Sequence, residues 1–251
     1  MEAKKRPLLE IRNVSKSFKK IRALKNVSFV VYKKEIIGLV GDNGAGKSTL
    51  IKIIAGVFPP DEGEICFEGK KVQFSSSKKT RTLGIETVYQ DLALFENMNV
   101  WRNIFLGKEL GECIGPIKFL DSRKMGKESR TIVKKIGLTL PSIEASIRTL
   151  SGGERQSLAI GRCLHFGAKL LLLDEPTSAL SIKETEKVLE SIKKARDLGF
   201  SIIFITHNLY HVYPVADRFI VLSHGVKTGD VKKEKIIIEK LAEMIRGHTL
   251  V

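Results

Sequence analysis

The decisive segment of this 251-residue chain is Gly41-Asp-Asn-Gly-Ala-Gly-Lys-Ser-Thr49. It follows the apolar run Ile36-Ile-Gly-Leu-Val40 and leads into Leu50-Ile-Lys-Ile-Ile-Ala55, so the order is strand, glycine-rich loop and helix. The loop fits the pattern G-x-x-x-x-G-K-[ST]. Glycine lets the backbone wrap closely around a phosphate chain, and the N-terminus of the following helix adds positive potential. The segment therefore predicts a binding site for a nucleoside triphosphate.

Two side chains of this loop have expected roles in the site. Lys47 is expected to reach the outer phosphates, and Ser48 is expected to offer its hydroxyl to Mg²⁺. The alternative, a glycine-rich turn without a ligand, is disfavoured by the flanking strand and helix. The residues predicted to hold the nucleotide here are Gly41, Asp42, Asn43, Gly44, Ala45, Gly46, Lys47, Ser48 and Thr49.

A pair of carboxylates follows a second apolar run, Leu170-Leu-Leu-Leu173. Continuous apolar runs are typical of parallel strands that are covered on both faces. Asp174 and Glu175 therefore stand at the carboxyl end of a buried strand, where ligands bind in open α/β sheets. Asp174 is expected to hold Mg²⁺ through water, and Glu175 to polarise the attacking water. A turn with a salt bridge is the alternative, and the phosphate loop makes the catalytic interpretation the better one.

The chain has the element pattern of an α/β fold. Strands and helices alternate in the second half, which favours a parallel sheet with crossover helices, and Ser181-Ile-Lys-Glu184 is a capping box that begins one of them. Short strands dominate the first third, and a helical segment is expected between them and the second half. The predicted strands are 8–14, 27–32, 64–67, 71–74, 84–90, 169–173, 201–205 and 218–222, and the predicted helices are 99–106, 121–136, 152–166, 181–197 and 234–246.

Composition narrows the class of protein. Hydrophobic residues make up 43% and charged residues 28%, and no apolar run approaches the roughly 18 residues of a membrane span. The net charge of +15 is compatible with binding to nucleic acid or acidic lipid. The basic residues, however, are spread thinly along the chain and lack the interleaved aromatic residues of a single-strand binding groove. Solvated surface is the better interpretation. The cysteines Cys66, Cys113 and Cys163 have no metal-ligand spacing and fit a reduced, cytosolic setting.

The heptapeptide Leu150-Ser-Gly-Gly-Glu-Arg-Gln156 resembles the signature peptide of ATP-binding cassette (ABC) ATPases, and it precedes Asp174 as it does in that family. The resemblance implies an ATPase that uses ATP and Mg²⁺. It also implies an α/β fold with a P-loop NTPase (RecA-like) core, an N-terminal antiparallel β subdomain and an inserted α-helical subdomain. In the family this peptide caps the γ-phosphate held by the opposite subunit, which implies a homodimer. The residues that take this role here are Ser151, Gly152, Gly153 and Glu154.

Three further residues match positions of the family. Phe18 resembles the aromatic residue that stacks on adenine, Gln90 the glutamine that senses Mg²⁺ and the γ-phosphate, and His207 the switch histidine. Taken alone, Phe18 is a core residue and His207 a polar cap, and His211 and His224 keep that plain interpretation. The implied catalytic residues are Lys47, Gln90, Glu175 and His207, and the implied metal ligands are Ser48, Gln90 and Asp174.

The resemblance also divides the chain. Residues 1–251 are expected to form one ABC ATPase domain, with the nucleotide-binding core in 1–90 and 157–230, the helical signature subdomain in 91–156 and a C-terminal helix in 231–251. Ser178-Ala-Leu-Ser181 takes the place of the family's dimer-contact loop, in which many members have aspartate where this chain has Ser181.

Segments 84–95 and 206–217 resemble the ATPases of monosaccharide importers. This implies separate membrane-spanning permease subunits, a periplasmic-type solute-binding protein as an indirect partner, and a location at the cytoplasmic face of the membrane. Phe95 and Trp101 are candidate permease contacts, with core packing as the open alternative. Other possibilities are an importer of nucleosides or another small solute, an exporter, an ABC ATPase acting on nucleic acid or ribosomes, and a binding module that has lost catalysis.

Overall fold

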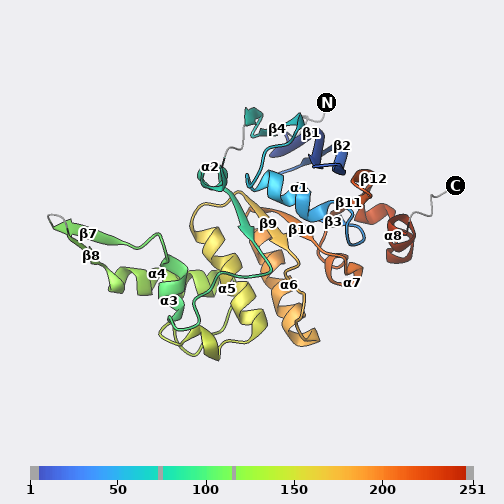
Figure 1. The fold of residues 1–251 in the computed structure, drawn as a ribbon. Coiled ribbons are helices and arrows are strands. Elements are labelled where there is room, and N and C mark those ends of the chain that lie inside the picture. The colour runs from blue at the N-terminus through green and yellow to red at the C-terminus, as the bar shows by residue number, and fades with distance from the viewer. Residues whose placement is uncertain (1–5, 73–75, 115–116, 247–251) are drawn as a thin grey trace.

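The computed structural model describes residues 6–72, 76–114 and 117–246. Its strands form a six-stranded sheet, a four-stranded sheet and a separate hairpin, with helices between and around them (Figure 1). Several predictions fall outside the described residues: positions 73 and 74 of the predicted strand 71–74, the two ends of the chain, and the side chain of Cys113.

The six-stranded sheet has the order β12-β11-β3-β10-β9-β6. Every neighbouring pair from β11 to β6 is parallel, and β12 alone is antiparallel, on β11. The central strands are apolar and buried on both faces, as the continuous hydrophobic runs predict. The strands are β3 Ile36–Val40, β6 Ile85–Val88, β9 Leu170–Asp174, β10 Ser201–Ile205, β11 Arg218–Ser223 and β12 Val226–Lys232.

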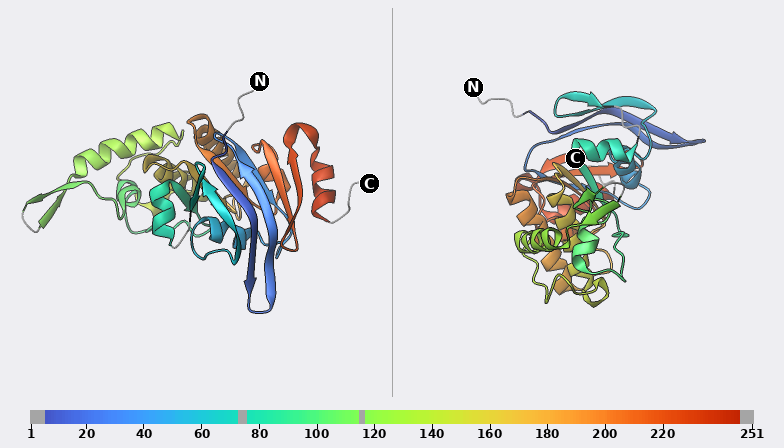
Figure 2. Two further views of the ribbon diagram at one scale, coloured as in Figure 1. Left: turned by 90° about the horizontal axis from the view of Figure 1, so that it is seen from above. Right: turned by 90° about the vertical axis from the view of Figure 1, so that its left-hand side faces the viewer.

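The four-stranded sheet is antiparallel and has the order β2-β1-β4-β5. The turn at residues 68 and 69 joins β4 to β5, which confirms the hairpin predicted there. The long hairpin of β1 and β2 extends beyond the body of the molecule (Figure 2). The strands are β1 Leu9–Phe18, β2 Ile21–Val31, β4 Glu62–Phe67 and β5 Lys70–Val72.

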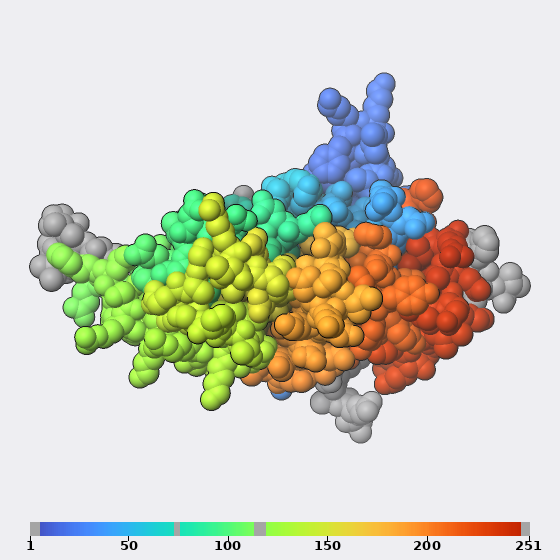
Figure 3. Space-filling view, turned by 90° about the horizontal axis from the view of Figure 1, so that it is seen from below, coloured from blue at the N-terminus to red at the C-terminus, as the bar shows by residue number. Residues whose placement is uncertain are grey.

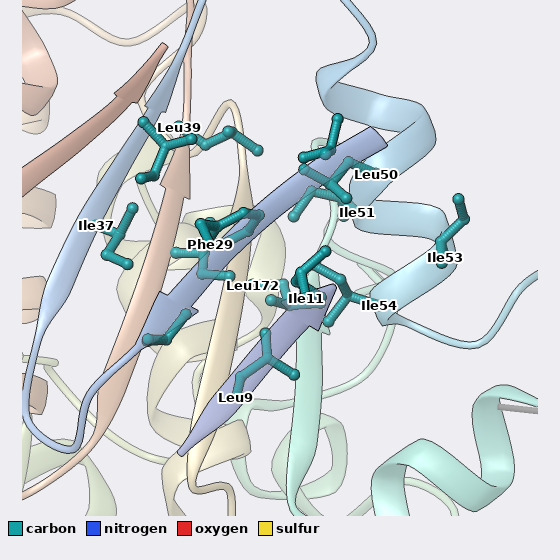
Figure 4. Packing of buried hydrophobic residues seen from close by; sticks show 14 of the residues in the cluster. Leu9, Ile11, Phe29, Ile37, Leu39, Leu50, Ile51, Ile53, Ile54 and Leu172 are labelled. Atoms are coloured by element: carbon teal, nitrogen blue, oxygen red, sulfur yellow. The ribbon is translucent and has the colours of Figure 1, made fainter. Parts of the chain in front are cut away.

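Helix α1 lies between the two sheets and joins them in one core (Figure 4). Leu50, Ile51 and Ile54 of α1 pack with Leu9 and Ile11 from the antiparallel sheet, and alternate side chains of β3, β9 and β10 complete this cluster. The opposite face of the parallel sheet packs against α5, α6 and α8. The helices are α1 Lys47–Ile54, α2 Ser77–Leu83, α3 Val100–Phe105, α4 Ser122–Lys135, α5 Gly152–His165, α6 Ile182–Asp197, α7 Leu209–Val212 and α8 Ile238–Ile245.

The segment predicted to be helical contains a hairpin as well. Strands β7 Gly111–Ile114 and β8 Ile117–Leu120 pair within the stretch that was expected only to separate two helices. The hairpin projects from the end of the molecule opposite α8 (Figure 1). Helix α5 runs through the expected subdomain boundary at 156/157, and residues beyond that boundary contact both parts: Leu158 packs with the inserted segment, whereas Ala159, Ile160 and Cys163 pack on the parallel sheet.

The end of the chain also differs from the prediction. Strand β12 runs through the expected boundary at 230/231, and the final helix begins at Ile238 instead of residue 234. Residues Lys233–Lys235 form a 3-10 turn, and Ile236 has extended backbone angles with a buried side chain, which interrupts the helix. Helix α2 was not predicted, although Ser76 caps its start and Gly84 ends it in a left-handed conformation.

Candidate functional site

The phosphate loop connects β3 to α1, and its conformation requires glycine at two positions. A Cβ at Gly41 would lie 2.2 Å from the carbonyl oxygen of Leu222. Gly46 has a φ of 101°, and a Cβ there would lie 2.8 Å from the carbonyl oxygen of Ala23. Gly46 is also the N-cap of α1 and provides no side-chain hydrogen bond to it. The first backbone N–H groups of α1 are therefore left for a ligand, and the positive end of the helix faces the same place.

Lys47 lies folded into this loop and is only 7% exposed. Its Nζ donates to the carbonyl oxygens of Gly41, at 2.7 Å, and Asp42, at 2.9 Å. Burial lowers the pKa of Lys47, and the charges of Glu175, Asp42 and Asp174 oppose that shift. An arriving phosphate would favour the charged ammonium by the same electrostatic effect.

The two carboxylates at the end of β9 have different surroundings. Burial raises the pKa of Asp174, and the neighbouring charge of Glu175 raises it further. Glu175 has a φ of 50°, which places a non-glycine residue in the left-handed region directly after the strand. The backbone thus turns sharply here, and Glu175 N donates to the carbonyl oxygen of Ile205 at 2.9 Å. Strained backbone of this kind is often found at functional sites.

The Glu175 carboxylate is held by the segment that follows β10. Thr206 Oγ1 donates to Glu175 Oε2 at 2.9 Å. Glu175 Oε1 accepts from the backbone N–H of His207 at 3.1 Å and lies 2.7 Å from His207 Nδ1. The two sequence-predicted residues Glu175 and His207 are therefore in direct contact, because parallel pairing of β9 and β10 places both carboxyl ends at one edge of the sheet.

One cavity of about 650 Å³ collects most of the predicted residues. Asn43 to Thr49 form one wall, and Gln90, Asp174, Glu175 and His207 form another. Ser178 from the predicted dimer-contact loop lines it as well. The remaining lining residues were not predicted, since no motif marks them: Ile21, Arg22, Ala23, Ile205, His224 and Gly225. Gly41 and Asp42 are not part of the lining, and their carbonyl oxygens accept from Lys47.

Phe18 is not in this cavity. Its ring is 42% exposed and meets the ring of Phe58 edge-on, with 5.2 Å between centroids. Phe18 ends β1, whereas the cavity wall is formed by residues 21–23 at the start of β2. Ile21 lines the cavity at this point, and the contact of Phe18 with adenine stays a prediction.

The signature turn lies apart from the cavity, at the N-terminus of α5. Ser151 and Glu154 form a capping box: Ser151 N donates to Glu154 Oε2 at 2.8 Å, and Glu154 N donates to Ser151 Oγ at 3.3 Å. Gly153 N donates to Oε1 of Glu184, in the first turn of α6, at 3.4 Å. The sequence marked Glu184 only as a helix-capping residue. The structure adds that it joins the two helix N-termini.

Phe95 and Trp101, the two candidate permease contacts, have different surroundings. Trp101 is buried and its Nε1 donates to Glu144 Oε2 at 2.9 Å, so core packing accounts for it. Phe95 is 54% exposed and lines a groove of about 240 Å³ with Leu106 and Phe166, between the inserted segment and the parallel sheet. Arg81 and Lys108 line the groove as well.

The oxygen donors of the cavity fit Mg²⁺. Ser48 offers a hydroxyl, Asp174 a carboxylate and Gln90 an amide, all of them hard ligands in one cavity. Within residues 6–72, 76–114 and 117–246 there is no group of three or more histidine, cysteine, aspartate or glutamate side chains that could hold a metal by themselves. Phosphate oxygens and water would have to complete the coordination, as is usual for Mg²⁺.

A parallel α/β sheet with a phosphate loop after β3 and a carboxylate pair at the end of β9, two strands away, defines a P-loop nucleoside triphosphatase. Within that class, the ABC transporter family matches residues 24–178, and the chain belongs to this family. It is 46% identical over 243 residues to the xylose/arabinose import ATP-binding protein XylG of Sulfolobus acidocaldarius, covering 97% of this chain and 95% of the relative. It is 44% identical over 216 residues to the fructose import ATP-binding protein FrcA of Rhizobium meliloti, covering 84% and 83%.

The fold also matches solved structures of this family. One is the dimeric, post-hydrolysis structure of an ATP-binding cassette bound to ADP and Pi, with a TM-score of 0.74 and 27% identity over 91% of this chain and all of that one. The expected fold class is thereby confirmed. In the part of the chain that the structure describes, none of the helices has both the length and the apolar character to span a bilayer.

Proposed function

We propose that this chain is the ATP-hydrolysing subunit of an ABC importer for a monosaccharide. The observation that carries the proposal is the meeting of Lys47, Asp174 and Glu175 in the cavity at the N-terminus of α1. The import proteins for xylose/arabinose and fructose, to which the chain is similar along most of its length, support the solute class.

In this proposal the residues of the cavity have separate roles. The N–H groups of the phosphate loop and Lys47 bind the β- and γ-phosphates, and Ser48, Gln90 and Asp174 would hold Mg²⁺, which neutralises phosphate charge when it is bound. Glu175 orients the attacking water and accepts its proton. For this, the Glu175 carboxylate has to exchange its bonds with Thr206 and His207 for the water, and His207 then contacts the γ-phosphate.

A second copy of the chain would complete each site. The turn at Ser151 and Gly153 lies outside the cavity of its own chain, so it is available to the nucleotide of another copy. Figure 3 shows the inserted segment and α6 as one continuous surface, with the β1–β2 hairpin standing out from it. Two identical chains related by a twofold axis would then bury two ATP molecules.

The groove beside Phe95 is the proposed docking site for a cytoplasmic helix of a permease subunit. Phe95, Leu106 and Phe166 offer an apolar surface, while Arg81 and Lys108 stand at its side. Docking there would place the chain at the cytoplasmic face of the membrane, and a periplasmic-type solute-binding protein would act on it only through the permease.

Replacing the proposed base tests the ATPase. Glu175→Gln keeps the shape of the side chain but removes its charge, so we expect hydrolysis to fall at least roughly 100-fold while ATP still binds. ATP should then convert the variant into a stable dimer, measured by light scattering after size exclusion. Glu186→Gln, an exposed substitution on α6, is the matched control and should behave like the wild type. Hydrolysis by Glu175→Gln at the wild-type rate would contradict the role of Glu175.

The solute class needs a separate measurement. Purified chain, permease and solute-binding protein reconstituted in proteoliposomes should hydrolyse ATP faster when xylose, arabinose or fructose is supplied. Stimulation by a nucleoside and not by any of these sugars would show that the transported solute is a nucleoside. The proposed ATPase activity would stand in that case.

A further inference from the structure

His211, which the sequence leaves as an ordinary polar residue, forms a second connection between the two segments that carry the proposed catalytic residues. It lies in α7, one helical turn after His207, and its ring is half-buried. Its Nδ1 lies 2.9 Å from Oγ1 of Thr177, a residue that is 2% exposed and follows Glu175 by two positions. Its Nε2 lies 3.2 Å from Nδ2 of Asn208.

These contacts determine the tautomer of the His211 ring. Asn208 Oδ1 accepts from the backbone N–H of Tyr210 at 3.0 Å and thereby caps α7, which leaves the Nδ2 amide group facing His211. Because Nδ2 can only donate, His211 Nε2 accepts. The proton is therefore on Nδ1, which donates to Thr177 Oγ1. In a protonated ring Nε2–H would face the Asn208 amide donor, so this arrangement requires neutral histidine.

The surroundings of the ring agree with this assignment. Burial lowers the pKa of His211. Two titratable groups influence this pKa from the neighbouring segments: Glu175 after β9 opposes the shift, and His207 after β10 adds to it. The shift points in the same direction as the hydrogen-bond geometry.

Besides the backbone bond from Glu175 N to Ile205 O, side chains make two links between the segments after β9 and β10, and the contact with Thr177 is one of them. In the first, the Glu175 carboxylate accepts from Thr206 and His207. This link has to open when Glu175 and His207 turn to water and phosphate. The second, from His211 to Thr177, joins two residues that are not part of the cavity lining, so it can persist.

We propose that His211, as the neutral Nδ1–H tautomer, is a positioning residue for ATP hydrolysis. It holds Thr177 against α7, and this keeps the loop that begins at Glu175 aligned with the segment that carries His207 after their direct contact has opened. The inference rests on the proposed ATPase, but the ring's protonation state belongs to the nucleotide-free protein and can be measured without hydrolysis.

The first test is nitrogen-15 NMR of the imidazole rings in the nucleotide-free chain. The sequence has five histidines, so the His211→Asn spectrum identifies the signals of His211 by their loss. We expect a ring protonated on Nδ1 alone that stays neutral below pH 6.5, the ordinary imidazole value. A ring protonated on Nε2 alone, or one that gains its second proton at or above that value, would overturn the proposal whatever the ATPase activity is.

The second test separates positioning from simple stability. His211→Ala is expected to lower kcat roughly tenfold with little change in KM for ATP, because misplaced groups slow the chemical step more than binding. His211→Asn keeps a donor near the position of Nδ1 and should recover most of the loss. Thr177→Val, which removes the acceptor, should lower kcat on its own and add little to His211→Ala.

Tyr210→Ala is the matched control, since Tyr210 is exposed in the same helix and contributes only its backbone N–H. It should hydrolyse ATP like the wild type. The proposal is overturned if His211→Asn is no better than His211→Ala, or if Thr177→Val and His211→Ala lower kcat additively. If the wild type itself does not hydrolyse ATP, the proposed function fails, while the NMR result still decides the state of the ring.

Discussion

The N-termini of α1 and α5 differ in how their first backbone N–H groups are satisfied. Gly46 caps α1 without any side-chain hydrogen bond, and the first turn of α1 has no acidic residue. Helix α5 begins with the Ser151–Glu154 capping box, and its Gly153 N–H donates to a second carboxylate, Glu184. One helix leaves its positive end open to a ligand, and the other satisfies that end with side chains of the same chain.

This difference explains how one chain can carry both halves of a shared site. An open helix end beside a buried lysine can bind phosphate by itself, so α1 is suited to the nucleotide of its own chain. The satisfied end of α5 keeps the separate monomer stable while the signature turn has no ligand. It can meet a phosphate only at the cost of rearranging Ser151, Gly153 or Glu184, which is expected of a contact that forms late, between two copies.

The largest effect is expected at the open end. Lys47→Ala removes the ammonium that is folded against the loop, and a charge-assisted hydrogen bond to phosphate is worth enough to weaken ATP binding about 100-fold. Isothermal titration with ATP measures this. Lys52→Ala, exposed on the same helix, controls for the loss of one positive charge and should bind within about threefold of the wild type. Equal weakening by both changes would mean that general charge, and not the position of Lys47, attracts the phosphates.

A smaller effect is expected at the closed end. A Cβ at Gly153 would lie 3.0 Å from both Cβ and the carbonyl oxygen of Glu184, so Gly153→Ala should push α5 and α6 apart slightly. In the Glu175→Gln background, we expect the ATP concentration that forms half of the dimer to rise roughly tenfold, with ATP binding by the monomer unchanged.

Gly126→Ala is the matched control for that change, because it also places alanine inside a helix. Its Cβ would lie 3.3 Å from the end of the Ile143 side chain, which can move. Dimer formation should stay at the level of Glu175→Gln without a second change. If Gly153→Ala weakened ATP binding by the monomer instead of the dimer, the two helix ends would not have the separate roles argued above.

The difference between the two helix ends also shows what the sequence could predict. The phosphate loop, the buried strand before Asp174 and the capping box at Ser181 are local patterns, in which neighbouring residues determine the conformation, and the structure has the loop, strand and helix where they were expected. Glu175 and His207 could be expected to meet because parallel strands bring their carboxyl ends to one edge.

The remaining features depend on packing between distant segments. The contact of Gly153 with Glu184 joins residues 31 positions apart, and that of His211 with Thr177 joins residues 34 positions apart. Both depend on how helices lie on the sheet, which no local pattern specifies. Phe18 ends β1, and its ring meets that of Phe58, a contact between residues 40 positions apart that no local pattern specifies.

The smallest effect is expected where Glu184 joins the two ends. Glu184→Ala removes the carboxylate that accepts from Ser181 N in the α6 capping box and from Gly153 N–H, and we expect Tm to fall by about 3 °C, whereas Glu184→Gln keeps an acceptor and should lose less. Glu186→Ala is the control, because Glu186 is exposed two residues further along α6, and it should leave Tm unchanged.

The pH dependence of this loss identifies its cause. Hydrogen bonds from Ser181 and Gly153 lower the pKa of Glu184 below its ordinary value of 4.5. The carboxylate therefore stabilises the fold above pH 4.5, and this contribution is lost as the pH falls through the lowered pKa. The Tm difference between wild type and Glu184→Ala should shrink over that range in thermal melts. A difference that stays constant down to low pH would show that Glu184 acts through packing of its side chain, and the carboxylate would then not be what closes the end of α5.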